Sequence, residues 1–316
     1  MRPMRGMGRR LRFLAPGGLV EVTSRTIHGR LLIQPTPRIA DLCHGVLARA
    51  ARLYPVDVHA FAFLGNHYHL LLTVPDAQRL AQFMNYLNSN LAREVGRAVR
   101  WREHFWGRRY QAIPVSEEET SQVERLLYVL RQGCKEGLVR RPAEWPGATS
   151  VRALLSGEPI RGSWIDRTSE YLSSKKGDPH DPRSFVSSET LDLVPLPCWK
   201  DLAPADYRNR VADLVAEVER ETARQIRATE REPLGADRVS RQNPHDAPNR
   251  RKQGPAPLVH AATSERRKAF REAYRQFASA FRRASTVFRC SGDGLERFAL
   301  FPPGSFPPPG PFLASA

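Results

Sequence analysis

Two histidines one residue apart open an apolar run in the stretch "FLGNHYHLLLTV", residues 63–74. The Gly-Asn pair before them is typical of a tight hairpin turn, so His67 starts the second strand of a predicted β-hairpin. Because side chains alternate along a strand, His67 and His69 share one face about 7 Å apart, and Tyr68 lies on the other. Two such imidazoles can bind a metal, but an isolated pair is also common as a structural feature.

The segment "SEEETSQVERLLYVLRQG" contains further residues that could take part in a reaction. It predicts a helix in which Ser116 is the N-cap and Glu119 closes a capping box. Tyr128 and Gln132 are four residues apart, which places them on one face of that helix, about 5–6 Å apart at Cβ. A phenol is a weak nucleophile unaided. A divalent metal that polarises a phosphate oxygen would make phenolate attack on phosphorus feasible.

The elements that must position these residues follow from periodicity and turn signals. We expect strands at 19–25, 30–34, 57–64, 67–74 and 110–115. We also expect two amphipathic helices: one is introduced by Pro37, and the other spans residues 80–95. Strand, helix, hairpin, helix and strand on one antiparallel sheet is the ferredoxin-like arrangement of an α+β fold. This predicts a core domain over residues 1–155.

Residues 156–316 predict a mainly helical, basic and Pro-rich extension. The stretch from Ser173 to Ser184 is expected to be a loop, and residues 231–257 to be mostly irregular. A last helix carries an aromatic stripe from Phe270 to Phe288, interpreted as packing, with arginines between the aromatic residues. "FPPGSFPPPG" predicts a Pro-rich tail.

Composition limits the partners and the compartment. The chain has 49 Lys and Arg against 33 Asp and Glu, a net charge of +16, which favours a polyanionic partner, nucleic acid first. An Arg-rich composition of the whole proteome would explain the same charge. We expect a cytoplasmic protein, because no apolar run is long enough for a signal peptide or a membrane span. The four cysteines form no CxxC pair, so no zinc ribbon is predicted.

The order and spacing of these motifs resemble a known family. "NHYHLLL", followed by Tyr128-x-x-x-Gln132, is similar to the HUH single-strand transposases with one catalytic tyrosine, especially the REP-associated tyrosine transposases. The segments "PGGLVEVTSR" and "FWGRRYQAIPV" also match, and the resemblance covers residues 10–155. Gln at position 132, in place of the usual Asn, is similar to mobile insertion-sequence members, whereas the long extension is not. A mobile enzyme and a resident, domesticated relative both fit this pattern.

The resemblance implies a role for each matching residue. His67, His69 and Gln132 would bind Mg²⁺ or Mn²⁺, and Tyr128 would form a 5′-phosphotyrosine bond and free a 3′-hydroxyl. The implied substrate is single-stranded or hairpin DNA, handled by a monomer or a homodimer. Basic residues that would contact DNA phosphates or form a solvated face are Arg9, Arg10, Arg12, Arg108 and Arg109.

Three functions compete at this point. The first is a transposase that cleaves and rejoins DNA through Tyr128. The second is a domesticated protein that binds structured nucleic acid without cleaving it, which the charge fits equally well. The third is a nuclease that uses a metal-activated water, in which case a Tyr128→Phe variant would still cut DNA.

Overall fold

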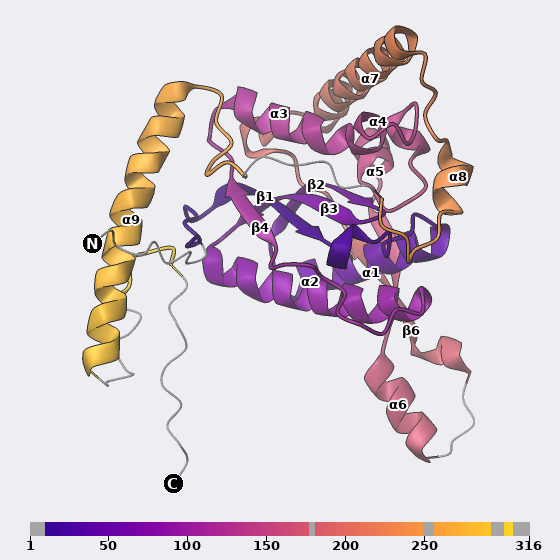
Figure 1. Cartoon of the computed structure of the whole chain (residues 1–316), viewed down its shortest axis with the longest axis horizontal. Helices are drawn as coiled ribbons and strands as arrows, with labels where there is room; N and C mark the ends of the chain where they lie inside the picture. Colours follow the sequence, from indigo (N-terminus) through magenta and orange to yellow (C-terminus); the bar gives the residue numbers. More distant parts are fainter. Residues whose placement is uncertain (1–9, 177–180, 249–255, 292–299, 306–316) are drawn as a thin grey trace.

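The computed structural model describes residues 10–176, 181–248, 256–291 and 300–305. Its centre is a four-stranded antiparallel sheet in the order β2-β3-β1-β4. The strands are β1 (Gly18–Arg25), β2 (Asp57–Leu64), β3 (His67–Val74) and β4 (Gln111–Pro114), connected by α1 (Pro37–Leu53) and α2 (Ala77–Ala98). This order is that of the ferredoxin-like fold, so the predicted α+β class is confirmed (Figure 1).

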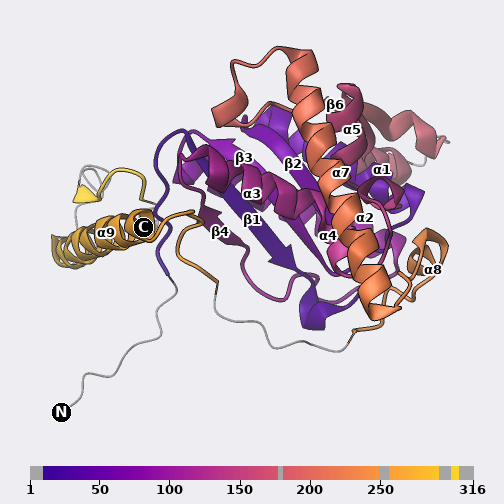
Figure 2. The same cartoon turned by 90° about the horizontal axis from the view of Figure 1, so that it is seen from above.

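Helices cover both faces of this sheet. Alternation along β3 sends Tyr68, Leu70 and Leu72 into a core with α1 and α2. The opposite side chains, His67, His69 and Leu71, face the layer formed by α3 (Glu119–Leu130) and α7 (Pro204–Thr229) (Figure 2). The predicted hairpin is therefore confirmed, with Tyr68 packed on the side away from both histidines.

Residues beyond 155 pack against both layers, and the predicted domain boundary there stays a prediction. The remaining elements are α4 (Gln132–Lys135), α5 (Val151–Ser156), β5 (Ile160–Ile165), α6 (Arg167–Lys176), β6 (Val186–Leu191), α8 (Ala236–Ser240) and α9 (Ser264–Ser291). The β5–β6 hairpin, which the sequence did not predict, lies on α1. Gly45 permits this contact, because a Cβ there would lie 2.0 Å from the carbonyl oxygen of Ser163.

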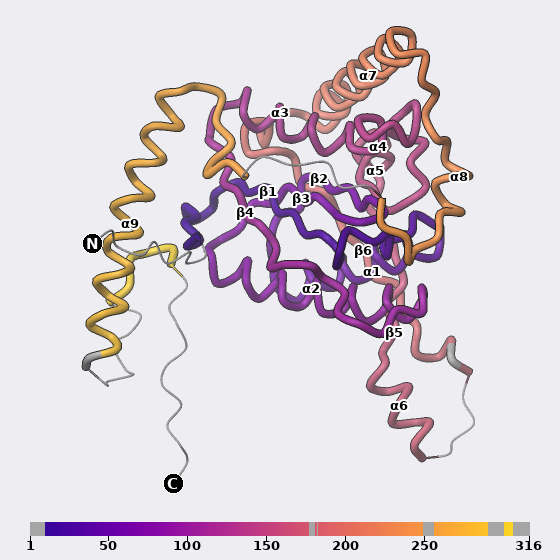
Figure 3. The backbone as a smooth tube through the Cα atoms, in the orientation of Figure 1, coloured from indigo at the N-terminus to yellow at the C-terminus, as the bar shows by residue number. Residues whose placement is uncertain are grey.

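The basic helix α9 lies beyond the β4 edge of the sheet (Figures 1 and 3). Its predicted aromatic stripe is confirmed as packing, because Phe13 contacts Phe270 and Phe277 at ring-centroid distances of 5.4 and 4.7 Å. A parallel bridge between Val115 and His260 joins the segment before α9 to the end of β4. In the described part of the chain, no helix has the length and apolarity to cross a bilayer.

Three local predictions were wrong. Residues 30–34 form no strand, because His28 and Gly29 have φ values of 52° and 72° and turn the chain away from the sheet. Ser116 does not cap α3, because the helix begins at Glu119 with Glu118 as its N-cap, and the Ser116 N–H that a capping box would use donates to the carbonyl of His260. Residues 173–176 belong to α6 rather than to a loop; residues 177–180, and the tail beyond 305, lie outside the described residues.

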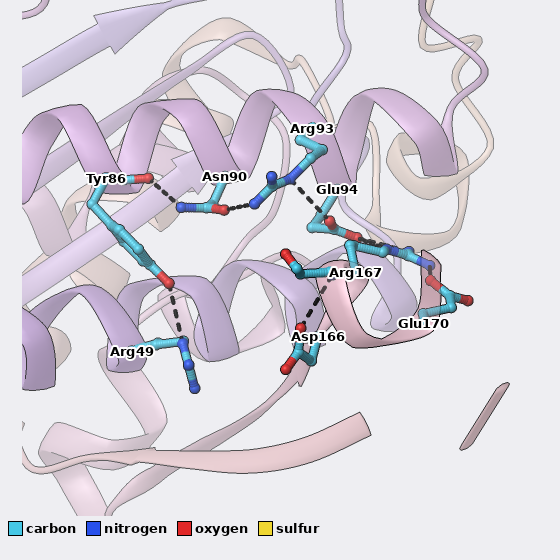
Figure 4. Close-up of polar contacts among 9 residues, drawn as sticks. Arg49, Tyr86, Asn90, Arg93, Glu94, Asp166, Arg167 and Glu170 are labelled. Atoms are coloured by element: carbon cyan, nitrogen blue, oxygen red, sulfur yellow. Dashed lines mark hydrogen bonds and ion pairs between the residues drawn. The ribbon is translucent and has the colours of Figure 1, made fainter. Parts of the chain in front are cut away.

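A polar network between Arg167 of α6 and Glu94 of α2 ties these two helices together (Figure 4). The guanidinium of Arg167 donates to the buried carboxylate of Glu94 at 2.7 and 3.0 Å and also pairs with Glu170 at 2.8 Å. Arg93 is a second cation 3.5 Å from Glu94. Only 1% of the Glu94 side chain is exposed, so its charge depends on these two partners.

Arg167→Ala is expected to lower the free energy of unfolding by about 2 kcal/mol. The substitution leaves a buried carboxylate with only the longer contact to Arg93, and breaking such a pair costs up to about 3–5 kcal/mol when no partner remains. Urea unfolding followed by circular dichroism measures the change. The control is Arg224→Ala, because Arg224 and its partner Glu221 are each about two-thirds exposed, so this substitution should change stability by less than about 0.5 kcal/mol.

Candidate active site

The two histidines of β3 lie side by side on the sheet face below α3. Their ring centroids are 5.2 Å apart. The Nδ1 atom of His67 is 2.7 Å from the side-chain oxygen of Asn66, and the Nδ1 atom of His69 is 2.8 Å from Glu21. In the tautomer set by these oxygen acceptors, Nδ1 donates its proton and Nε2 keeps a free lone pair. Within the described residues, neither Nε2 has a hydrogen-bond partner, so two nitrogen ligands are available.

The environment of His67 keeps its ring neutral. Burial, together with the neighbouring His69, Arg25 and Lys135, lowers the pKa of His67 to about 3. A neutral imidazole is the form that binds a metal. At neutral pH, His67 is therefore in the form that the predicted site needs.

Glu21 of β1 is the buried carboxylate behind His69. It is 2% exposed and contacts three basic side chains, with distances of 2.8 Å to His69, 2.8 Å to His260 and 3.6 Å to Arg125. Burial alone would raise the pKa of Glu21, but hydrogen bonds from His260 and His69 outweigh it and hold the pKa far below its usual range. The carboxylate is therefore ionised and fixes the orientation of the His69 ring.

Tyr128 of α3 stands over this pair. Its ring lies edge-on to His69 at a centroid distance of 5.3 Å. Three cations surround the ring, with Arg125, Arg131 and Lys135 at 4.8, 5.4 and 4.5 Å from its centroid. The Lys135 ammonium donates to the hydroxyl oxygen at 3.3 Å. The charge of Lys135 beside this oxygen stabilises negative charge on it and attracts a phosphate.

Gln132 lies in the short helix α4, with its side chain buried. Its amide nitrogen donates to the carbonyl of Tyr128 at 2.9 Å, which leaves the amide oxygen as the free acceptor. Gln132 lines a small cavity with Ala62 and Leu64, the β2 residues that pair with His69 and His67. The carboxamide therefore lies over the same pair of strands as the histidines.

The donor set fits a divalent cation through two imidazole nitrogens and one carboxamide oxygen. Across the described ranges, His, Cys, Asp and Glu side chains form no metal-binding cluster of three or more. A site here would therefore depend on Gln132 as the third ligand. The roles of His67, His69, Gln132 and Tyr128 stay predictions.

Of the predicted DNA-contacting arginines, the four that the structure describes make no contact with Tyr128. Arg9 lies outside the described residues. Arg10 donates to the carbonyl of Ala256 at 2.8 Å, and Arg108 is exposed. Arg12 and Arg109 line a separate cavity on the α2 side of the sheet. As DNA contacts, all five stay predictions.

Sequence reasoning missed the groups that surround the tyrosine. Arg125, Arg131 and Lys135 are three before, three after and seven after Tyr128, a helical spacing that could have identified them. The alternation of β1 could have placed Glu21 on the histidine face. His260 carried no local signal, because it is far from β1 along the chain.

Comparison with known proteins bears on this arrangement. Residues 30–132 match the family model described as IS200-like transposase. Among solved structures, a REP-associated tyrosine transposase bound to a REP hairpin is 15% identical and covers 48% of this chain and 86% of its own, with a TM-score of 0.41. A putative transposase from Deinococcus radiodurans R1 is 19% identical and covers 38% and 94%, with a TM-score of 0.28. The search of curated proteins found no match.

The matched range contains most of the candidate site. It includes both histidines and Tyr128, and it ends at Gln132. It leaves out Glu21, Lys135 and His260. The resemblance to IS200-like transposases is therefore confirmed for the segment that carries the predicted nucleophile and ligands.

Proposed function

We propose that this chain, whose residues 30–132 match the IS200-like transposases, cleaves and rejoins single-stranded or hairpin DNA through Tyr128 with the help of Mg²⁺ or Mn²⁺. One observation carries the proposal: Tyr128 packs against His69, and both histidines use Nδ1 for a hydrogen bond, so that Nε2 of each ring has no partner among the described residues and can act as a metal ligand.

In the proposed transesterification, Tyr128 is the nucleophile and neighbouring cations stabilise the charge that develops. The Tyr128 oxygen attacks a backbone phosphorus, the bond from phosphorus to the 3′-oxygen breaks, and a 3′-hydroxyl and a 5′-phosphotyrosine result. Rejoining reverses the step with a 3′-hydroxyl as the attacking group. Lys135 and Arg131 stabilise charge on the tyrosine oxygen and on the incoming phosphate.

The metal would be held by His67, His69 and Gln132. When bound, it would polarise a phosphate oxygen and offset the charge that develops in the transition state. Asn66 and Glu21 prepare this arrangement, since each fixes one imidazole through its Nδ1 atom. Two imidazoles suit Mn²⁺ better than Mg²⁺, so we expect tighter Mn²⁺ binding.

The test of this function is incubation with end-labelled hairpin oligonucleotides and Mn²⁺, followed by denaturing electrophoresis. The proposal expects label at the size of the protein, lost on chelation. Tight binding of hairpins that survives chelation, with no covalent product from any of them, would support the domesticated binder instead.

Glu21→Gln is expected to weaken Mn²⁺ binding about 10- to 100-fold, the usual cost of losing an outer-shell carboxylate. The amide keeps the size of the side chain but removes the charge that orients His69 and balances His260 and Arg125. Isothermal titration calorimetry measures the affinity. Glu189→Gln is the control, because Glu189 is a buried carboxylate paired with Arg49 and Arg52 away from the site. Equal Mn²⁺ affinities of the two variants would contradict the role of Glu21.

A further inference from the structure

A cavity of about 430 Å³ opens on the α2 side of the sheet. Its lining includes Arg12, Asn85, Asn88, Trp106, Arg109 and Tyr110. Trp106 and Tyr110 also pack against the core beneath it. The volume is within the roughly 300–1,000 Å³ of small-molecule sites. The cavity is separate from the tyrosine site, because α2 and α3 cover opposite faces of the sheet (Figure 2).

The cavity contains two arginines, Arg12 and Arg109, for which the described residues provide no counter-ion. Arg12 stacks on the Tyr110 ring, with its guanidinium carbon 4.0 Å from the centroid. Neither Arg12 nor Arg109 has a carboxylate or hydrogen-bond acceptor among the residues that the structure describes. Burial, together with the neighbouring charge of Arg109, lowers the pKa of Arg12 to about 10, although Tyr110 acts against this. A partly buried, unpaired cation of this kind is stabilised by an anion.

Two neutral side chains of the cavity, Tyr110 and Asn88, also have polar groups that no described residue satisfies. The Tyr110 hydroxyl is buried without a hydrogen bond. The side-chain oxygen of Asn88 accepts a hydrogen bond from the Tyr68 hydroxyl at 2.6 Å. The amide N–H groups of Asn88 therefore point away from Tyr68, and no described residue accepts a hydrogen bond from them. Unsatisfied donors beside an unpaired guanidinium are the groups that a phosphate and the polar edge of a base would satisfy.

The cavity lies near the strand end that carries His67. Directly after Trp106, the N–H of Gly107 donates a hydrogen bond to the carbonyl of Arg25 at the end of β1, at 2.9 Å. Arg25 is the register partner of His67. A single strand at the tyrosine site could therefore pass around this strand end to the cavity.

We propose that the cavity binds one unstacked nucleotide of a single-stranded DNA segment, with its phosphate between Arg12 and Arg109. The base lies against the apolar floor, with its polar edge toward Tyr110 and Asn88. This assignment rests on the proposed function, since it takes the ligand to be part of the DNA substrate. A single strand is required because a base in a duplex is stacked and cannot enter.

The test measures binding of a fluorescein-labelled random single strand of about 30 nucleotides by anisotropy, at several KCl concentrations, with the full chain. Arg12→Gln is expected to raise Kd about tenfold and to reduce the slope of log Kd against log salt by about 0.7, the value for one phosphate contact on a single strand. Tyr110→Phe is expected to raise Kd about threefold with an unchanged Tm, because the hydroxyl makes no hydrogen bond in the free protein. Arg227→Gln on α7 removes an equal charge from an exposed site and should change Kd less than twofold.

Equal Kd values and salt slopes for Arg12→Gln and Arg227→Gln would overturn the assignment. Competition by free dAMP at the same concentration as the labelled strand would also overturn it, in favour of a mononucleotide ligand. The covalent adduct at Tyr128 is a separate readout. Its absence together with a retained Arg12 effect would contradict the cleavage mechanism alone.

Discussion

Tyr128→Phe is expected to abolish the covalent protein–DNA adduct and to lower strand cleavage by about 10³-fold or more, since the nucleophile itself is removed. Phenylalanine keeps the ring that packs on His69 and that lies under Arg125, Arg131 and Lys135. Only the hydroxyl that receives the Lys135 hydrogen bond is lost. The variant should therefore fold and bind single strands like the wild type.

The matched control is Tyr171→Phe. Tyr171 is 65% exposed on α6, so this substitution also removes one phenolic hydroxyl but should leave cleavage unchanged. Cleavage by Tyr128→Phe at the wild-type rate, with products that end in a free 5′-phosphate, would favour a metal-activated water. In that case the tyrosine would be a structural neighbour of the histidine pair.

The second large effect is expected from His69→Ala, which should lose measurable Mn²⁺ binding and lower cleavage by about 10²- to 10⁴-fold. The estimate follows from removing one of three ligands and the charge stabilisation that the metal would supply. His69 has a central place, because it contacts Glu21 on one side and the Tyr128 ring on the other. Calorimetric titration with Mn²⁺ and the gel assay measure the two losses separately.

Because His69 is buried, alanine at this position could also impair folding, and a second variant separates the two effects. His69→Gln keeps a polar side chain of similar length and should preserve the Tm better than alanine while still weakening Mn²⁺ binding. His104→Ala, at an exposed position away from the pair, is the control and should bind Mn²⁺ like the wild type. Wild-type Mn²⁺ affinity in both His69 variants would show that the histidine pair is structural.

The central hairpin could be predicted from the sequence because its signals are local. The Gly-Asn turn fixes the register, and strand alternation then places both histidines on one face and Tyr68 on the other. The prediction that Tyr128 and Gln132 share one helix was wrong, because α3 ends at Leu130 and Gln132 begins the separate short helix α4. The local signals were sufficient to predict the hairpin and to select the main candidate residues.

The rest of the site depends on contacts between distant segments. Glu21 meets His69 only after β1 pairs with β3, and His260 reaches Glu21 only because its segment bridges to the end of β4. The same bridge explains why the predicted capping box does not form, since the Ser116 N–H that Glu119 would accept from already donates to the carbonyl of His260. The β5–β6 hairpin was missed because its stability depends on packing against α1 at Gly45.

The C-terminal region supplies one of the contacts of the candidate site. His260 lies outside the range that matches the transposase family, yet it contacts the carboxylate that orients a predicted metal ligand. The region after residue 155 therefore contributes directly to the order of the candidate site. A truncation after residue 155 would remove this contact together with the α7 layer over α3.

The most direct measurement of the central claim is mass spectrometry of the protein after incubation with hairpin oligonucleotides and Mn²⁺, followed by nuclease trimming and proteolysis. The account predicts one modified peptide, with a nucleotide attached through its 5′-phosphate to Tyr128. Attachment to another tyrosine would contradict the assignment of the nucleophile. Unmodified Tyr128 under conditions in which the hairpins are cut would contradict the covalent mechanism.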